Sequence, residues 1–142
     1  MSRKRRRDAA GLRATIEQRA GRRCEYCQSP QTACGYRFHL EHIIPLSEDG
    51  HDDEPNRALA CAACNLAKSD RMRGIDPQTG RSVVLFNPRT DIWTEHFDWD
   101  CDLALIVGQT PVGRATVAAL SLNDDLRLPS RHLWFSVGLL PP

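Results

Sequence analysis

The sequence predicts an α+β fold that is held together by a four-cysteine zinc site and continues into a C-terminal extension of a hairpin and a helix. Two observations predict it. Short segments along the chain alternate between helical and strand periodicity, and four of the six cysteines form two Cys-x-x-Cys pairs. The length of 142 residues is typical of one domain with a real apolar core. With 41% hydrophobic and 26% charged residues, the composition argues against a wholly disordered chain.

The N-terminal residues 1–7 are expected to form a basic flexible arm. Residues 1–23 contain nine Lys or Arg and two acidic residues, which gives this stretch a net charge of +7. The rest of the chain has ten Lys or Arg and sixteen acidic residues, a net charge of −6, so the overall charge of +1 hides a strong asymmetry. A basic arm on an acidic body is typical of chains that contact phosphate backbones. A solvated tail that only aids solubility is the alternative.

No stretch of the sequence approaches eighteen consecutive apolar residues, so no membrane span is expected. The basic N-terminus is not followed by the apolar segment of a secretory signal. We therefore expect a cytoplasmic protein without a membrane partner, in a compartment where thiols stay reduced.

Residues 8–75 are expected to form the core domain. Leu12, Ile16 and Ala20 recur every four residues and would share one face of a helix. Residues 36–42 alternate with period two, as in a strand, with Phe38, Leu40 and His42 on one face and His39 and Glu41 on the other. The expected elements in order are a helix over 8–20, a strand over 36–42, an acidic loop over 47–55, a strand over 56–60 and a helix over 65–72.

Residues 76–142 are expected to form an extension that packs on the core. Residues 83–86 and 92–99 are interpreted as two strands of a hairpin, joined by a turn at 87–90. A further short strand is expected over 104–107. Thr110 and Pro111 have the residue types of an N-cap and a first helical position, which predicts a helix to about residue 122. The last twenty residues could form another helix.

The cysteine pairs predict a structural zinc site. A Cys-x-x-Cys pair folds into a tight knuckle that directs both thiolates to one point, and two knuckles make a tetrahedral four-sulfur site suited to Zn²⁺. Disulfides are the alternative, which the inferred compartment disfavours. The predicted ligands are Cys24, Cys27, Cys61 and Cys64. Cys34 and Cys101 remain and are expected to be inert, partly buried thiols.

A carboxylate, an imidazole and two carboxamides lie between or beside these pairs. Glu41 adjoins His42, and Asn56 and Asn65 follow downstream. Carboxylate and amide oxygens are hard ligands suited to Mg²⁺ or Mn²⁺. A neutral histidine beside such a metal can act as a general base, because its ordinary pKa is close to neutrality. Cationic side chains on the following helix would favour a phosphodiester as substrate. These are Lys68, Arg71 and Arg73.

This composite motif strongly resembles the HNH endonuclease family in its zinc-stapled form. The resemblance covers roughly residues 12–75 and is carried by Arg23-Cys24-Glu25-Tyr26-Cys27, Leu40-Glu41-His42-Ile43-Ile44-Pro45, residues 56–59 and Cys61-Ala62-Ala63-Cys64-Asn65-Leu66-Ala67-Lys68. It implies a ββα-metal (His-Me finger) core, in which two antiparallel strands and a helix hold one divalent ion.

The resemblance also implies roles for single residues. His42 would be the general base, Glu41 and Asn65 would bind the catalytic metal, and Asn56 would brace the loop that orients His42. Asn65 could instead only cap a helix that starts there. Ser69 stands where the family often has a further His or Asn ligand, so the two-ligand version of the site is expected.

The implied activity is that of an endonuclease that hydrolyses phosphodiester bonds in DNA with Mg²⁺ or Mn²⁺, by nicking or by double-strand cleavage. RNA as a substrate and a dimeric state both stay open. The alternatives are a non-catalytic, zinc-stabilised nucleic-acid-binding module and a protein-interaction domain of a larger system. A pure binding module has no need of Glu41, His42 and Asn65 together, which favours the enzyme.

Overall fold

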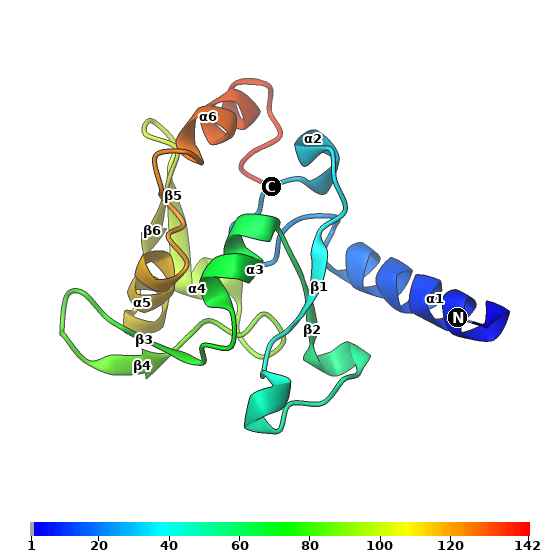
Figure 1. Ribbon diagram of the computed structural model, residues 1–142. Coiled ribbons are helices and arrows are strands. Elements are labelled where there is room, and N and C mark those ends of the chain that lie inside the picture. Colours follow the sequence, from blue (N-terminus) through cyan, green and yellow to red (C-terminus); the bar gives the residue numbers. More distant parts are fainter. Residues whose placement is uncertain (1) are drawn as a thin grey trace.

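The computed structural model describes residues 2–142 as helices and three separate antiparallel strand pairs, which confirms the predicted α+β class. Figure 1 shows a long N-terminal helix projecting from a body in which the remaining elements gather. The first half of the chain contains α1 (Arg3–Arg19), α2 (Gln31–Cys34), β1 (His39–His42), the 3-10 turns η1 (Leu46–Glu48) and η2 (Glu54–Asn56), β2 (Arg57–Ala60) and α3 (Ala62–Lys68).

Strands β1 and β2 form the antiparallel pair expected at the centre of the core. Their register pairs His39 with Ala60 and His42 with Arg57. The structure shortens the predicted first strand to its last four residues, and α3 follows β2 directly. This order of two antiparallel strands and a helix is the ββα arrangement that the resemblance implied.

Helix α3 begins at Ala62, three residues before the predicted start. The Sγ atom of Cys61 accepts a hydrogen bond from the Cys64 amide and so caps the helix. Asn65 therefore lies inside the helix, and the alternative that Asn65 caps it is wrong. The helix also ends earlier than predicted, at Lys68, where Ser69 adopts a positive φ of 49°.

Helix α1 starts at Arg3, so residues 3–7 are helical, whereas we expected residues 1–7 to form a basic flexible arm; Met1 lies outside the described residues. The Ser2 side chain accepts a hydrogen bond from the Arg5 amide, and long unbranched arginine side chains favour helix. Ile16, at the other end of α1, is fully buried, as its place on the predicted apolar face requires.

The second half contains β3 (Arg73–Ile75), β4 (Ser82–Val84), α4 (Trp93–His96), β5 (Phe97–Asp100), β6 (Leu105–Gly108), α5 (Pro111–Ala119) and α6 (Leu128–Ser136). The hairpin predicted between 83–86 and 92–99 is wrong, because β4 pairs with β3 and β5 pairs with β6. Residues 93–96 are helical. The strand expected over 104–107 and the helix beginning at Thr110 and Pro111 are confirmed, with the Thr110 hydroxyl accepting from the Gly113 amide.

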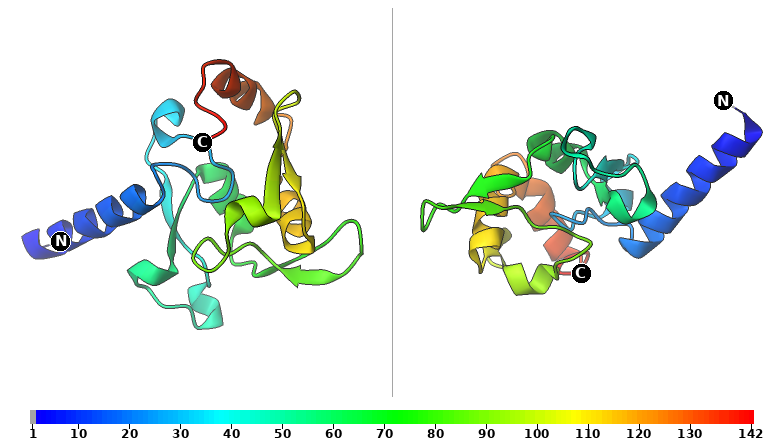
Figure 2. Two further views of the ribbon diagram at one scale, coloured as in Figure 1. Left: turned by 180° about the vertical axis from the view of Figure 1, so that it is seen from behind. Right: turned by 90° about the horizontal axis from the view of Figure 1, so that it is seen from below.

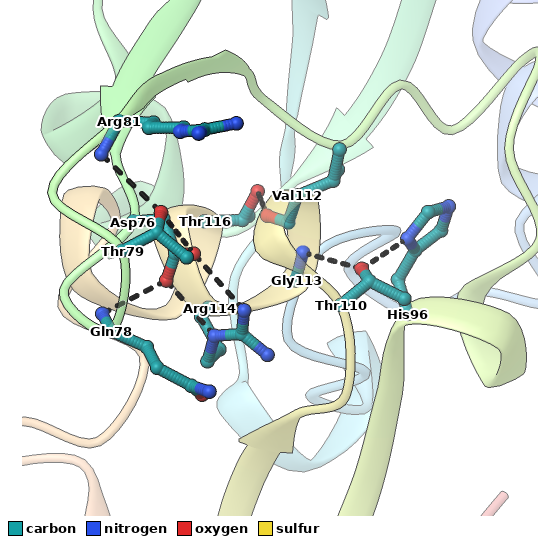
Figure 3. A network of polar contacts seen from close by, with 10 residues as sticks. All are labelled: Asp76, Gln78, Thr79, Arg81, His96, Thr110, Val112, Gly113, Arg114 and Thr116. Atoms are coloured by element: carbon teal, nitrogen blue, oxygen red, sulfur yellow. Dashed lines mark hydrogen bonds and ion pairs between the residues drawn. The ribbon is translucent and has the colours of Figure 1, made fainter.

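A buried ion pair fixes the β3–β4 turn on α5 (Figure 3). Both oxygens of Asp76 accept from Arg114, at 2.9 Å from Nε and 3.0 Å from the terminal nitrogen. The same carboxylate accepts from the Gln78 amide and the Thr79 hydroxyl. These bonds hold the pKa of Asp76 well below its usual range, the bonds from Arg114 contributing most.

One apolar cluster joins the two halves of the molecule. Phe38 and Leu59 of the first half and Phe86 and Ile106 of the second are buried in it. The indole of Trp93 also donates a 2.8 Å hydrogen bond to the Tyr26 carbonyl. The two halves of the chain are thus joined by buried side chains and by a direct polar contact; Figure 2 shows the second-half elements against the β1–β2–α3 unit. No helix within residues 2–142 is both long enough and apolar enough to cross a membrane.

Candidate metal centre and groove

The four predicted zinc ligands lie together. Their sulfur atoms are all within 4.8 Å of one another, and all four residues are buried. All six cysteines of the chain are free, so these four are not used in disulfides. Four buried sulfurs gathered around one point match the donor set and the closed geometry of a structural zinc site, so the residues fit the metal that the spacing predicted.

Polar groups around this cluster offer hydrogen bonds to its sulfurs. The Ser29 hydroxyl lies 3.0 Å from Sγ of Cys27, and the Arg127 guanidinium donates to Sγ of Cys64 at 3.5 Å. Burial raises the pKa of the Cys24 thiol well above its usual value. A bound cation would have to offset this cost, because zinc is held by thiolates. Arg127 supplies part of the positive charge that a cluster of thiolates needs.

An open groove of about 440 Å³ lies between β1 and α3. Glu41, His42 and Asn65 all line it, so the structure brings together three of the residues that the sequence singled out. Ser69, at the position of the missing family ligand, lines the groove as well.

Glu41 lies at the bottom of a polar cluster, with a side chain only 3% exposed. One oxygen accepts from the Tyr26 hydroxyl, and the other lies 3.2 Å from the Lys68 ammonium. Burial raises the pKa of Glu41, while the neighbouring Lys68 acts in the opposite direction. Each oxygen of a carboxylate has a second lone pair, so Glu41 can still offer a ligand atom to a cation.

His42 ends β1 and is held by an aspartate from the loop between the strands. Nε2 of His42 lies 2.7 Å from Oδ1 of Asp52, and Arg57 of β2 also donates to this oxygen. The hydrogen bond with His42, and then the charge of Arg57, lower the pKa of Asp52. The side chain of His42 is a quarter exposed, so the imidazole remains open to solvent.

Asn56 is buried and connects both sides of the loop that separates β1 from β2. Its side-chain oxygen accepts from the Ile44 amide at 2.9 Å, and its amide nitrogen donates to the carbonyls of Ile44 and His51 at 2.8 and 2.7 Å. These bonds join the residues just after His42 to the residue just before Asp52. Asn56 therefore links the two ends of this loop.

Asn65 is half-buried on α3, and within residues 2–142 its side chain makes no hydrogen bond. Its position one turn before Lys68 places it on the helix that also carries Cys64. A carboxamide that is not used in the described structure is available as an oxygen ligand.

The structure contradicts the expectation that Lys68 contacts a phosphate. Its side chain is 2% exposed, and its ammonium donates to the carbonyls of His42 and Ile43 at 3.2 and 2.9 Å in addition to the ion pair with Glu41. Arg71 and Arg73 are exposed but do not lie on α3, because the helix ends at Lys68. Arg71 bonds to the carbonyls of Ala67 and Ala119, and Arg73 belongs to β3.

Two residues of the site were missed by reasoning from the sequence. Asp52 belongs to the acidic loop expected over 47–55, and nothing in the local pattern distinguishes it from Asp49 or Asp53. Tyr26 lies between the first two cysteines, and this position was the only feature of the sequence that could have indicated a role in the site.

The structure belongs to the class of small α+β domains that are built around a buried cluster of four cysteines. The comparison with protein families then identifies the domain: residues 24–71 match the model of the family described as HNH endonuclease. The predicted family resemblance is therefore confirmed for this part of the chain. No curated protein and no solved structure matches the chain significantly.

Proposed function

We propose that the protein is a metal-dependent endonuclease that hydrolyses phosphodiester bonds in DNA. The observation that carries the proposal is the groove between β1 and α3, in which an imidazole, a carboxylate and a carboxamide come together inside the HNH segment. A general base beside two hard oxygen ligands is the equipment that metal-assisted hydrolysis requires.

His42 would accept the proton of the attacking water. An ionised carboxylate can only accept a hydrogen bond, so the 2.7 Å contact with Asp52 implies that Nε2 of His42 carries a proton. Nδ1 is then the basic nitrogen. Asp52 would hold this tautomer and stabilise the imidazolium that forms when the proton is taken.

Glu41 and Asn65 would hold one Mg²⁺ or Mn²⁺ ion. The donor set fits, because both residues offer hard oxygen atoms to the same groove and two protein ligands leave room for water and substrate oxygens. When bound, the ion supplies Lewis-acid stabilisation of charge on the phosphate and the leaving oxygen. Tyr26 and Lys68 would orient the Glu41 carboxylate, and Asn56 would keep His42 and Asp52 at a fixed separation.

The experiment is a plasmid-nicking assay with Mg²⁺ or Mn²⁺, compared with EDTA. We expect His42→Ala to lower the cleavage rate about 10²- to 10⁴-fold, the usual contribution of a general base. His132→Ala is the matched control, because this histidine is exposed on α6. Equal activity of the His42→Ala protein and the wild type would refute the assignment of the base.

A non-catalytic nucleic-acid-binding module is the second candidate. It is favoured by the ion pair of Glu41 with Lys68, since a nearby ammonium opposes binding of a divalent cation. Two assays of the same protein separate these functions, because a binding module would retain DNA in a gel-shift assay but leave plasmid intact with either metal.

A further inference from the structure

Helix α1 has one anchored half and one free half. At the anchored end, Arg13 donates to the Phe38 carbonyl at 2.9 Å and Arg19 donates to the Arg57 carbonyl at 2.6 Å. These carbonyls belong to the β1–β2 region, so the helix is fixed to the candidate nuclease core. By contrast, residues 2–11 are all exposed, and Figure 2 shows this part extending away from the body.

The free half carries an unfavourable charge arrangement. Residues 3–7 are five consecutive cations, and the first turn contains no acidic residue. Cations are destabilising at the positive end of the helix dipole, and like charges three or four positions apart repel each other. A polyanion bound to this half would remove both costs.

The five cations are not confined to one face of the helix. Successive residues are rotated by about 100°, so five in a row point in all directions around the axis. A phosphate chain on one side would meet only some of them. The major groove of B-form DNA, about 12 Å wide, admits a helix and has phosphates along both walls.

A membrane surface fits this half of α1 less well. Interfacial helices need a face of large apolar side chains, and residues 2–11 contain no apolar side chain larger than alanine. The charge pattern therefore favours a nucleic-acid backbone over an anionic bilayer.

We propose that the free half of α1 docks in the major groove of duplex B-form DNA and contacts phosphates on both walls. This inference rests on the proposed nuclease function and makes duplex DNA its substrate class. Duplex RNA is disfavoured, because its major groove is too deep and narrow to admit the helix. Contacts to phosphate carry no sequence information, so α1 would position the DNA without selecting a sequence.

The test measures binding by fluorescence anisotropy in the full-length His42→Ala protein, which keeps binding separate from cleavage. The variant of the free half of α1, called the arm variant here, combines Arg3→Gln, Arg5→Gln and Arg7→Gln. The control combines Arg22→Gln, Arg37→Gln and Arg81→Gln, which removes the same charge from exposed positions outside α1. The probes are duplex DNA, single-stranded DNA and duplex RNA of one sequence, and vesicles with an anionic lipid.

We expect the arm variant to lose about tenfold or more in affinity for duplex DNA and to show a salt slope smaller by about 0.9 for each lost phosphate contact. The control should lose clearly less. An equal loss in the control, or an equal loss for all three nucleic acids, would overturn groove docking, and vesicle binding that depends on the arm would assign it to membranes instead.

A structural measurement gives a second outcome. Hydrogen exchange of the amides in residues 4–9 should slow when duplex DNA is added, because the bound phosphates stabilise the first helical turns. Unchanged exchange at saturating DNA would contradict the proposal. A wild type that fails to cleave would refute the proposed nuclease activity. An unchanged affinity of the arm variant for duplex DNA would refute only the docking of α1.

Discussion

Glu41, His42 and Lys68 share one small polar cluster, although the lysine lies 26 positions beyond the histidine. Buried charges are costly unless they are paired, and Lys68 meets this requirement by bonding to one carboxylate and two carbonyls. The Lys68 side chain, whose charge is suited to an external phosphate, thus pairs with the buried carboxylate of Glu41. At this scale, burial decides the role of a residue whose type alone permits several.

Asp52 is the residue whose substitution tests the orientation of His42. We expect Asp52→Ala to lower the cleavage rate by about 10- to 100-fold while leaving DNA affinity nearly unchanged, because the exposed carboxylate acts through the imidazole. The ¹⁵N chemical shifts of the His42 ring should show loss of the Nε2–H tautomer. Asp53→Ala is the control from the same loop. Unaltered ring shifts in Asp52→Ala would contradict the orienting role.

At the scale of elements, the predictions from sequence were wrong where one segment is compatible with both a helix and a strand. Residues 92–99 carry aromatic side chains at positions 93, 97 and 99, which favour a strand, yet the segment divides into α4 and β5, and Phe97 pairs with Gly108 of β6. Gly108 and Gly113 allow this packing: a Cβ atom at Gly113 would lie 2.0 Å from the His96 carbonyl oxygen. Strand pairing depends on such close backbone contacts between distant segments, and the periodicity of a single segment does not predict them.

The contact between the β3–β4 turn and α5 predicts how stability depends on pH. The pKa of Asp76 is lowered in the folded state. The ionised carboxylate therefore contributes fully to the free energy of unfolding above the ordinary aspartate pKa of about 3.9, and this contribution is lost as the pH falls toward the lower pKa of the folded state. Asp76→Asn should therefore lower the melting temperature at pH 6 more than at pH 3.

Thermal unfolding followed by circular dichroism from pH 6 to pH 3 measures this effect. Asp125→Asn, at an exposed position, is the control and should leave the melting temperature nearly unchanged at each pH. A difference between wild type and Asp76→Asn that stays constant over this range would show that the ion pair with Arg114 is not responsible.

At the scale of the whole molecule, the metal centre and the apolar cluster connect the same segments. The cysteine pairs join the loop after α1 to the start of α3, and Arg127 adds a contact from the segment that leads into α6. The buried apolar cluster contains residues from Ile16 to Leu122. Removing the metal should consequently affect both halves of the chain.

We expect about one zinc ion per chain in elemental analysis and a cooperative loss of structure on chelation, since metal binding contributes directly to folding in such sites. Cys61→Ser should reduce the zinc content and the melting temperature strongly. Cys101→Ser, at an exposed cysteine outside the cluster, should change neither. A zinc-free protein that remains folded with an unchanged melting temperature would contradict a structural role for the metal.

The sequence by itself determined the four-cysteine cluster, the HNH segment, the ββα order and the helix beginning at Thr110, because each depends on residue types at short, fixed spacings. Only the tertiary structure decided that Lys68 faces Glu41, that Asp52 holds His42 and that β3 pairs with β4. These contacts join residues whose local patterns are unremarkable, and they are selected by burial and charge pairing in the folded chain. Local chemistry therefore identifies the candidate site, and packing across the chain selects the partners that orient it.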